Sequence, residues 1–407
     1  MRVYLRTYGC RANQYDTEQV RAVIEGSGGV IVDDPAEADA AVFNSCAVTT
    51  EAEVELRKGI RGAARQNGGL HTVVMGCAAA LDRGQLEALP TVAGVVAGGD
   101  VQSVAASLGL PPMAAAAARQ QSTRALLRIQ DGCDEHCTFC ATTLARGANR
   151  SRPIRDVVGE ALGLAERHPE IVLTGIHIGT WGRDLGLSLG SLVAALVRGV
   201  PAVRFRLSSV EATEVDDGLA RCFEDPSRLA PHLHAPLQSG SDRLLRRMGR
   251  HWYTAARYAE AVERLAGARP VFGLGADVIA GFPGETEDDH RETLSLMRGL
   301  PFTYLHVFPY SARPGTAATR LPDPVHPTVI RRRAAELRAA GARAASQYQA
   351  SRTGARADVI VVRGDRREGL TEDYLVVDVA STLPRGSRFV GRLGRGEGRL
   401  CATPVES

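Results

Sequence analysis

Short apolar runs alternate with longer amphipathic segments along the first hundred residues. Val3–Tyr8, Ala40–Asn44 and Thr72–Met75 are short runs with β-branched or aromatic members, a pattern typical of buried strands. Between them, Thr17–Glu25 and Glu51–Gln66 have the residue spacing of helices. Strands that alternate with helices predict a parallel α/β sheet.

The same alternation resumes after a segment that has little capacity for a specific core. Two prolines precede a run of alanines and a polar stretch, so residues 113–123 are predicted to be a linker. Beyond it, six apolar runs alternate with helical segments and predict a partial barrel of six βα units, whose chemistry should lie at the carboxyl ends of the strands. The six runs are Ala125–Gln130, Ile171–Gly175, Val203–Ser208, His232–Leu237, Val271–Ile279 and Thr303–Phe308.

The last part of the chain changes to short strands with Gly-rich turns. Asp358–Val362 and Tyr374–Val379 have this pattern and predict a small antiparallel β-barrel. The predicted organisation is an N-terminal parallel α/β domain over residues 1–112, a partial (βα)6 barrel over residues 124–347 and the small barrel over residues 350–405.

Composition favours a globular protein that binds metal through reduced thiols. The chain has 407 residues, 44% of them hydrophobic, and a net charge of +3, which is only a weak hint of an acidic partner. Its start lacks the apolar run of a signal peptide, and no stretch approaches the roughly 18 apolar residues of a membrane span. We therefore expect a cytoplasmic protein with no membrane association, in which eight cysteines bind metal rather than form disulfides.

Three cysteines lie within eight residues, directly after the first strand of the predicted barrel. Cys133, Cys137 and Cys140 could hold three irons of a 4Fe-4S cluster and leave the fourth iron without a protein ligand. Zinc is the alternative, with His136 as a fourth ligand. Zinc motifs usually come as paired Cys-x-x-Cys knuckles, and this run has no partner pair nearby. Phe139, directly before the last cysteine, also fits the iron-sulfur motif, so a cluster is favoured.

Three further cysteines follow three strands of the N-terminal sheet. Cys10, Cys46 and Cys77 come two or three residues after a predicted strand, and such loops emerge on one edge of a parallel sheet. Each could also be a small packing residue, but three at equivalent places favour a second cluster with one open iron. Gly9 and Gly76 suit a close approach of the backbone to a cofactor.

The remaining two cysteines are interpreted as packing residues. Cys222 lies on a predicted helix with Leu219 and Phe223, and Cys401 ends a late strand.

The motif formed by Cys133, Cys137, Phe139 and Cys140 matches the signature of the radical S-adenosylmethionine superfamily, Cys-x-x-x-Cys-x-aromatic-Cys. Further motifs resemble the methylthiotransferases of that superfamily: Gln130–Cys133, Ala145–Gly147, Arg150–Pro153, Leu173–Gly175, Pro236–Ser241, Asp277–Thr286 and Tyr310–Thr316. The resemblance covers essentially the whole chain. It implies an N-terminal α/β domain with three cluster cysteines, a radical SAM barrel and an RNA-binding barrel of the TRAM type.

This resemblance also implies an activity. Family members are transferases with two 4Fe-4S clusters and S-adenosylmethionine, and the chemistry rests on these cofactors rather than on a catalytic side chain. One cofactor molecule provides a radical that removes hydrogen from adenine C2, and another methylates the sulfur that is inserted. The implied partners are a tRNA substrate and an electron donor such as flavodoxin or ferredoxin. The sulfur donor is left open.

The branch of the family is indicated by two segments. Gly9–Glu18 and Arg206–Glu211 are similar to enzymes that act on N6-threonylcarbamoyladenosine at position 37 of tRNA. The isopentenyladenosine and ribosomal-protein branches usually have Gly-Cys-Gln-Met-Asn and Gly-Cys-Pro-Lys-Asn at the first of these places. Ala141–Leu144 departs from the usual Ile-Ile-Pro-aromatic sequence, so a specialised small metabolite is a further alternative.

Polar residues at predicted strand ends are candidates for holding the nucleoside part of the cofactor, and each could instead be a capping or turn residue. They are Thr174, Ser209, Glu211, Gln238 and Asp277, with Phe139 contributing backbone. Arg146, Arg150 and Arg152 are candidates for phosphate or substrate contacts, with surface ion pairs as the alternative.

Overall fold

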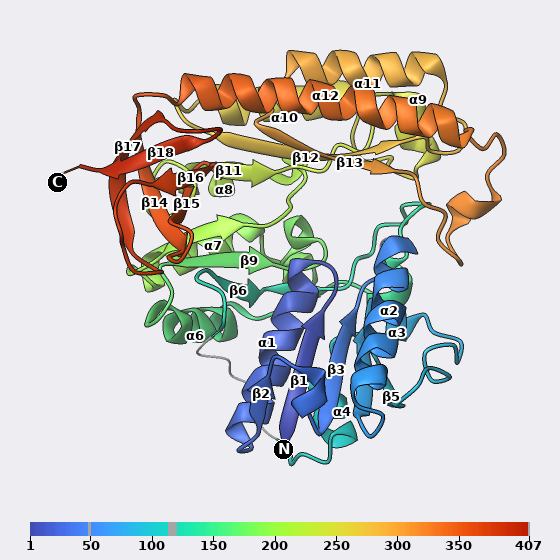
Figure 1. Ribbon diagram of the computed structural model, residues 1–407. Coiled ribbons are helices and arrows are strands. Elements are labelled where there is room, and N and C mark those ends of the chain that lie inside the picture. The colour runs from blue at the N-terminus through green and yellow to red at the C-terminus, as the bar shows by residue number, and fades with distance from the viewer. Residues whose placement is uncertain (48–49, 113–119, 406–407) are drawn as a thin grey trace.

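Three groups of strands organise the protein (Figure 1). The structure is a computed structural model that describes residues 1–47, 50–112 and 120–405. Most of the predicted linker, residues 113–119, therefore lies outside the described residues, and the domain boundaries stay a prediction. None of the helices in the described ranges is both long enough and apolar enough to cross a membrane.

The first group is a five-stranded parallel sheet with the order β2-β1-β3-β4-β5. Its strands are β1 (Arg2–Thr7), β2 (Val30–Val32), β3 (Ala40–Ser45), β4 (His71–Gly76) and β5 (Val92–Ala97). Its helices are α1 (Arg11–Gly26), α2 (Thr50–Gln66), α3 (Cys77–Ala80) and α4 (Val101–Ser107). Apolar residues of α1 and α4 pack on one face and those of α2 and α3 on the other, so the central strands are buried. The predicted parallel α/β sheet is confirmed.

The second group contains the six predicted βα strands. They are β6 (Ala125–Arg128), β9 (Glu170–Thr174), β10 (Arg204–Leu207), β11 (His232–His234), β12 (Gly273–Ala280) and β13 (Tyr304–Pro309). They form two parallel three-stranded sheets, β10-β9-β6 and β11-β12-β13. A single bridge between Ser209 and His234 joins the two sheets just beyond β10. The predicted partial barrel is therefore present, and it is split at its centre.

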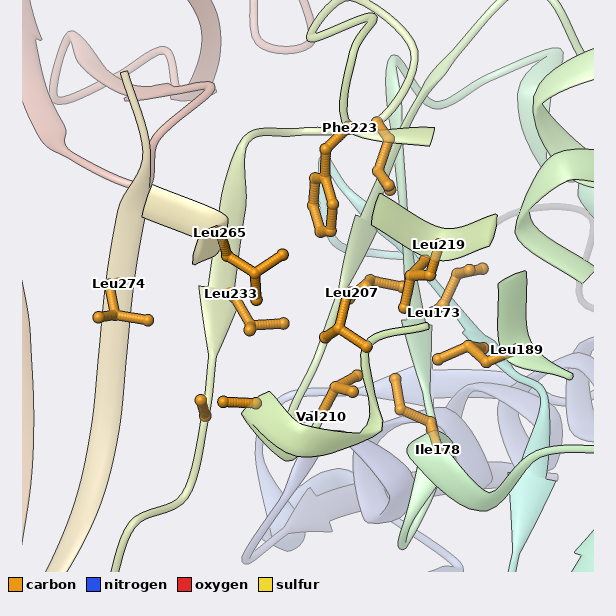
Figure 2. Close-up of a cluster of buried hydrophobic side chains, with 14 of the residues drawn as sticks. Leu173, Ile178, Leu189, Leu207, Val210, Leu219, Phe223, Leu233, Leu265 and Leu274 are labelled. Atoms are coloured by element: carbon orange, nitrogen blue, oxygen red, sulfur yellow. The ribbon is translucent and has the colours of Figure 1, made fainter. Parts of the chain in front are cut away.

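Helices cover the outside of this partial barrel. They are α6 (Ile154–Ala165), α7 (Leu189–Gly199), α8 (Asp217–Cys222), α9 (Asp242–Arg247), α10 (Ala255–Gly267), α11 (Glu287–Gly299) and α12 (Pro327–Ser351). Figure 2 shows part of the core between strands and helices, where Leu173, Leu207 and Leu233 contribute from neighbouring strands. Because side chains alternate along a strand, the residues between these leucines face the lumen. Many of those lumen residues are polar, including Glu170, Arg206 and His234.

The third group is a closed barrel with the order β14-β15-β16-β18-β17. Its strands are β14 (Arg356–Arg363), β15 (Glu368–Thr371), β16 (Val376–Val379), β17 (Arg388–Arg395) and β18 (Leu400–Pro404). Four of its five pairings are antiparallel, as predicted, whereas β16 and β18 are parallel. The exception follows from the odd number of strands, since strand direction cannot alternate all the way around a closed ring of five.

This closed barrel seals the amino-terminal end of the partial barrel. Arg206 in the lumen donates to the carbonyl oxygens of Thr371 and Glu372, both at 3.0 Å. At Gly273, the first residue of β12, a Cβ atom would lie 2.1 Å from the carbonyl oxygen of Asp373. The carboxyl ends of the strands, where βα loops carry active sites, are left for the cysteine-bearing segments.

Candidate functional site

The N-terminal cysteines lie at the carboxyl ends of three adjacent strands. Cys10 caps α1 after β1, Cys46 follows β3, and Cys77 begins α3 after β4. Asn13, one turn into α1, joins two of them: its Oδ1 atom lies 3.5 Å from the Sγ of Cys10 and 4.0 Å from the Sγ of Cys77. The predicted convergence of these thiols at one sheet edge is therefore observed.

Glycine is required at two places beside these cysteines. Gly9 has a φ of +110°, and a Cβ atom there would lie 2.7 Å from the Cβ of Cys46 and 3.0 Å from its Sγ. Gly76 has a φ of +99°, and its Cβ would lie 2.5 Å from the Oδ1 of Asn44. Any larger residue would be strained at both places, and at Gly9 it would also push against Cys46.

A short helix connects the two cysteine groups. Helix α5 (Thr142–Arg146) begins two residues after Cys140, and the backbone N–H of Thr142 donates to the Sγ of Cys140 at 3.3 Å. At its other end, Arg146 donates to the Sγ of Cys77 at 3.4 Å and to Oδ1 of Asn13 at 3.0 Å. The partial barrel therefore contributes a cation to the thiol site of the N-terminal sheet.

The cysteine run of the partial barrel has polar partners of its own. Arg250 donates to the Sγ of Cys137 at 3.4 Å, and His177 Nδ1 lies 3.6 Å from the Sγ of Cys133. Glu211 accepts hydrogen bonds from Arg250 and Trp252, and so holds the guanidinium in place. Both thiol sites thus have a buried arginine directed at one sulfur.

The environment of these thiols suits a metal cluster better than a free nucleophile. Burial raises the pKa of Cys137 to about 12 despite the opposing charge of Arg250, and burial likewise raises the pKa of Cys77 against Arg146. Such thiols become ligands only when a metal supplies further positive charge.

In the described chain, neither cysteine triad has all three sulfurs within 4.8 Å of one another. A single tetrahedral zinc, with Zn–S bonds of about 2.3 Å, needs closer sulfurs, and His136 is exposed, so the spacing disfavours zinc.

A cavity of about 190 Å³ lies between segments that carry the two cysteine groups. Cys140 lines it from the partial barrel, and Ala47, the residue after Cys46, lines it from the N-terminal sheet. Three residues predicted to hold the cofactor, namely Phe139, Gln238 and Asp277, also line this cavity. The ring of Phe139 packs edge-on against Phe282 at 6.3 Å between centroids.

The other three predicted cofactor residues do not line this cavity. Thr174 is buried at the end of β9, Ser209 is exposed after β10, and Glu211 forms an ion pair with Arg250.

Asp277 is the carboxylate that lines the cavity. Burial alone would raise its pKa, but hydrogen bonds from His234 at 3.0 Å and His306 at 3.2 Å outweigh burial and lower it. Asp277 is therefore an ionised acceptor beside the cavity.

The three arginines predicted to contact phosphate or substrate have different environments. The Arg146 side chain is 1% exposed and is held by Asp16 at 2.8 Å. Arg152 pairs with Glu160 at 2.8 Å and donates to the backbone. Only Arg150 is exposed, with Asp131 at 3.7 Å. Arg146 and Arg152 are structural residues rather than free phosphate contacts.

Sequence reasoning missed Asn13, His177 and Arg250. Asn13 lies three residues after Cys10 and so one turn along the same face of α1, but the predicted helix began only at Thr17 and did not include it. Arg250 approaches Cys137 from far along the chain, and no local pattern indicates that contact. Cys222 packs against the main core and Cys401 lies within β18, apart from both triads.

Two family matches cover the two cysteine-bearing regions. Residues 2–98 match the uncharacterized protein family UPF0004, and residues 127–297 match the Radical SAM superfamily. The fold agrees with a solved radical S-adenosylmethionine methyltransferase, TsrM from Kitasatospora setae. That structure superposes with a TM-score of 0.59 at 15% identity, over 78% of this chain and 76% of that chain. Fold and cysteine motif together define a radical SAM protein.

Similar proteins of known name identify one family within the radical SAM superfamily. A threonylcarbamoyladenosine tRNA methylthiotransferase, MtaB, of Thermotoga maritima is 35% identical over 78% of this chain and 77% of the relative. A protein of the same name from Rickettsia prowazekii is 32% identical over 97% of this chain and 95% of the relative. The chain belongs to the MtaB family of radical SAM tRNA methylthiotransferases. The predicted resemblance is confirmed, and the protein is a transferase that uses a 4Fe-4S cluster and S-adenosylmethionine to modify tRNA.

Proposed function

We propose that this protein converts N6-threonylcarbamoyladenosine at position 37 of tRNA to its 2-methylthio derivative, using two 4Fe-4S clusters and two molecules of S-adenosylmethionine. The observation that carries the proposal is a cavity lined by Cys140 of one cysteine triad and by Ala47, the residue after Cys46 of the other. The names of the curated relatives support this nucleoside over isopentenyladenosine, a ribosomal protein or a small metabolite.

The residues suited to each cofactor follow from the site. Cys10, Cys46 and Cys77 would hold one cluster, and Cys133, Cys137 and Cys140 the other, each through three irons. S-adenosylmethionine would lie near Phe139, Gln238 and Asp277 in the cavity. Thr174, Ser209 and Glu211 stay candidates for further contacts with it. When bound, these groups supply the radical and the methylthio sulfur that an unactivated aromatic carbon requires.

The side chains of the protein prepare this site. Arg146 and Arg250 offset the negative charge of the thiolates, and hydrogen bonds to cluster sulfurs tune the reduction potential. Asp277, kept ionised, would accept a hydrogen bond from a cofactor hydroxyl or amine. We further propose a cytoplasmic location, an electron donor such as flavodoxin or ferredoxin, and domains at residues 1–112, 124–347 and 350–405.

Nucleoside mass spectrometry of tRNA tests the substrate. A deletion strain should lose the 2-methylthio adduct of threonylcarbamoyladenosine and retain the unmethylthiolated nucleoside. The wild-type gene and a Cys222→Ala control should restore the adduct, whereas a Cys133→Ala variant should not. An unchanged tRNA profile in the deletion strain would exclude this substrate and leave a protein or metabolite as the alternative.

Anaerobic iron and sulfide analysis tests the number of clusters. Two cubic clusters give about eight irons per chain, and replacing Cys10, Cys46 and Cys77 with alanine should reduce the content to about four. A wild-type content of about four irons would reject the second cluster.

A further inference from the structure

A second, larger cavity of about 460 Å³ lies where all three strand groups meet. Arg11 of α1, Arg124 before β6 and Tyr374 of the closed barrel each contribute to its wall. Leu126 of β6 and Val172 of β9 also line it, and both alternate with the outward-facing core residues of their strands. The cavity therefore borders the lumen of the partial barrel.

Four arginines line this cavity, Arg11, Arg124, Arg363 and Arg385, and two of them have a carboxylate partner. Arg124 pairs with Glu170 at 3.3 Å, and Arg363 lies 4.0 Å from Glu368. Within the described residues, no carboxylate lies within ion-pair distance of Arg11 or Arg385, but Arg385 donates to the hydroxyl of Thr123 and to the carbonyl oxygen of Gln121. Arg11 donates a hydrogen bond to the hydroxyl of Tyr374 at 2.8 Å, and its guanidinium lies 5.9 Å from the centre of the Tyr374 ring.

Tyr374 is held rigidly in this arrangement. It has a left-handed φ of +73°, which an aromatic residue rarely adopts without support. Its ring stacks on His232 at 4.4 Å between centroids, and the guanidiniums of Arg124 and Arg206 lie 5.9 Å and 5.3 Å from its centre. Arg11 is therefore positioned by a fixed partner while its charge stays available to a ligand.

Arg11 also connects this cavity with the thiol site. It is the residue directly after Cys10 and the first residue of α1. The wall of this cavity and the N-terminal thiol site are therefore joined by consecutive residues.

We infer that Arg11, positioned by Tyr374, binds the carboxylate of the threonylcarbamoyl group of the substrate nucleoside. This inference rests on the proposed function. The amino-acid substituent adds one carboxylate that an unmodified adenosine lacks, and a carboxylate can enter a protein interior only with a cation and hydrogen-bond donors. An arginine without a carboxylate partner, beside a cavity that borders the lumen, supplies both.

The same oxyanion chemistry could come from an RNA backbone phosphate, so the test separates the two sources. Three synthetic anticodon stem-loops of one sequence would carry threonylcarbamoyladenosine, its carboxyl methyl ester or adenosine at position 37. Their dissociation constants are measured anaerobically with the reconstituted protein at one salt concentration, since electrostatic RNA affinity depends on salt.

We expect wild-type protein to bind the free acid about tenfold or more tightly than the ester or the adenosine form, the size of one charge-assisted hydrogen bond. Arg11→Gln should remove this preference. Binding of the adenosine form should stay within about twofold of wild type, since adenosine has no carboxylate for Arg11 to bind. Arg11→Lys should retain part of it. The control Arg150→Gln, outside this cavity, should preserve the full preference. Iron content and circular dichroism check that each variant is folded.

Each outcome has a distinct meaning. If wild-type protein binds all three stem-loops equally, the proposed nucleoside is wrong. If it prefers the threonylcarbamoyl form but binds acid and ester equally, or if Arg11→Gln keeps the preference, the substrate stands and the role of Arg11 is rejected. If Arg11→Gln weakens all three equally, Arg11 contacts a phosphate. The comparison of acid with ester uses wild-type protein and so remains decisive even if Arg11→Gln does not fold.

Discussion

Replacing Arg146 with methionine should destabilise the contact between the N-terminal sheet and the partial barrel. Arg146 comes from α5, and its guanidinium donates to Asp16 at 2.8 Å and Asn13 at 3.0 Å, both on α1. The side chains of Arg146 and Asp16 are 1% and 0% exposed. Methionine keeps the length and the apolar stem of the side chain but removes every donor, so the change isolates the polar contacts.

The expected loss of stability can be bounded from these contacts. Removing one partner of a buried ion pair costs about 3–5 kcal/mol, because the other charge stays buried without compensation. Asp16 keeps a second cation, Arg128 at 2.5 Å, and this places the loss near the lower bound, at about 3 kcal/mol. At a few degrees per kcal/mol, the thermal midpoint should fall by on the order of 5–10 °C.

Scanning calorimetry of the cluster-free protein measures this effect without a contribution from metal binding. The matched control is Arg150→Met, four residues along, where the side chain is 61% exposed and lies 3.7 Å from Asp131. Such a surface change should cost at most about 0.5 kcal/mol. If the two variants have the same midpoint, the buried arginine does not hold the two parts together and the argument is wrong.

Three further predictions follow from other contacts. Gly9→Ala should lose the N-terminal cluster and reduce the iron content from about eight to about four per chain, because its Cβ would lie 2.7 Å from that of Cys46; full iron loading would contradict this. Inserting one alanine into α5 turns the helix by about 100° and should abolish methylthiolation while cleavage of S-adenosylmethionine persists; loss of both activities would argue against separate roles for the two sites. Burial would raise the pKa of Glu170, but Arg206, Arg204 and Arg124 outweigh it and hold the pKa well below 4.5. The ionised carboxylate therefore stabilises the folded state above that pH and loses this effect on acidification, so urea midpoints between about pH 5 and 3 should fall more steeply for wild type than for Glu170→Gln; equal slopes would contradict the shift.

Local patterns were enough to predict the strands and the sheet edge that carries the thiols. Cys10, Cys46 and Cys77 each follow an apolar run, and parallel strands end on one edge, so their convergence needed no long-range information. The same patterns did not identify β2 or β5 as strands. Val92–Ala97 is interrupted by glycine and alanine, which weakens its resemblance to a strand.

Contacts that depend on distant segments were not predictable. Arg146 was predicted to contact phosphate or substrate, with a surface ion pair as the alternative, because an arginine is rarely buried and nothing near it in the sequence indicates Asp16 or Cys77. The split of the partial barrel between β10 and β11 is a property of strand pairing that no single segment of the sequence shows. The parallel pairing of β16 with β18 follows from the count of five strands, which becomes known only when β15 and β17 are assigned.

The placement of α5 limits how the two thiol sites can move relative to each other. Thr142 contacts Cys140 at one end of the helix and Arg146 contacts Cys77 at the other, so five residues of rigid backbone separate the two contacts. A helix of that length spans about 7.5 Å. A nucleobase of similar size could lie between groups bound at its two ends. Because Asp16 also fixes Arg146, separating the two sites would require a buried ion pair to break. The spacing is therefore set by packing within the protein before any substrate binds, and substrate binding need not supply energy to bring the sites together.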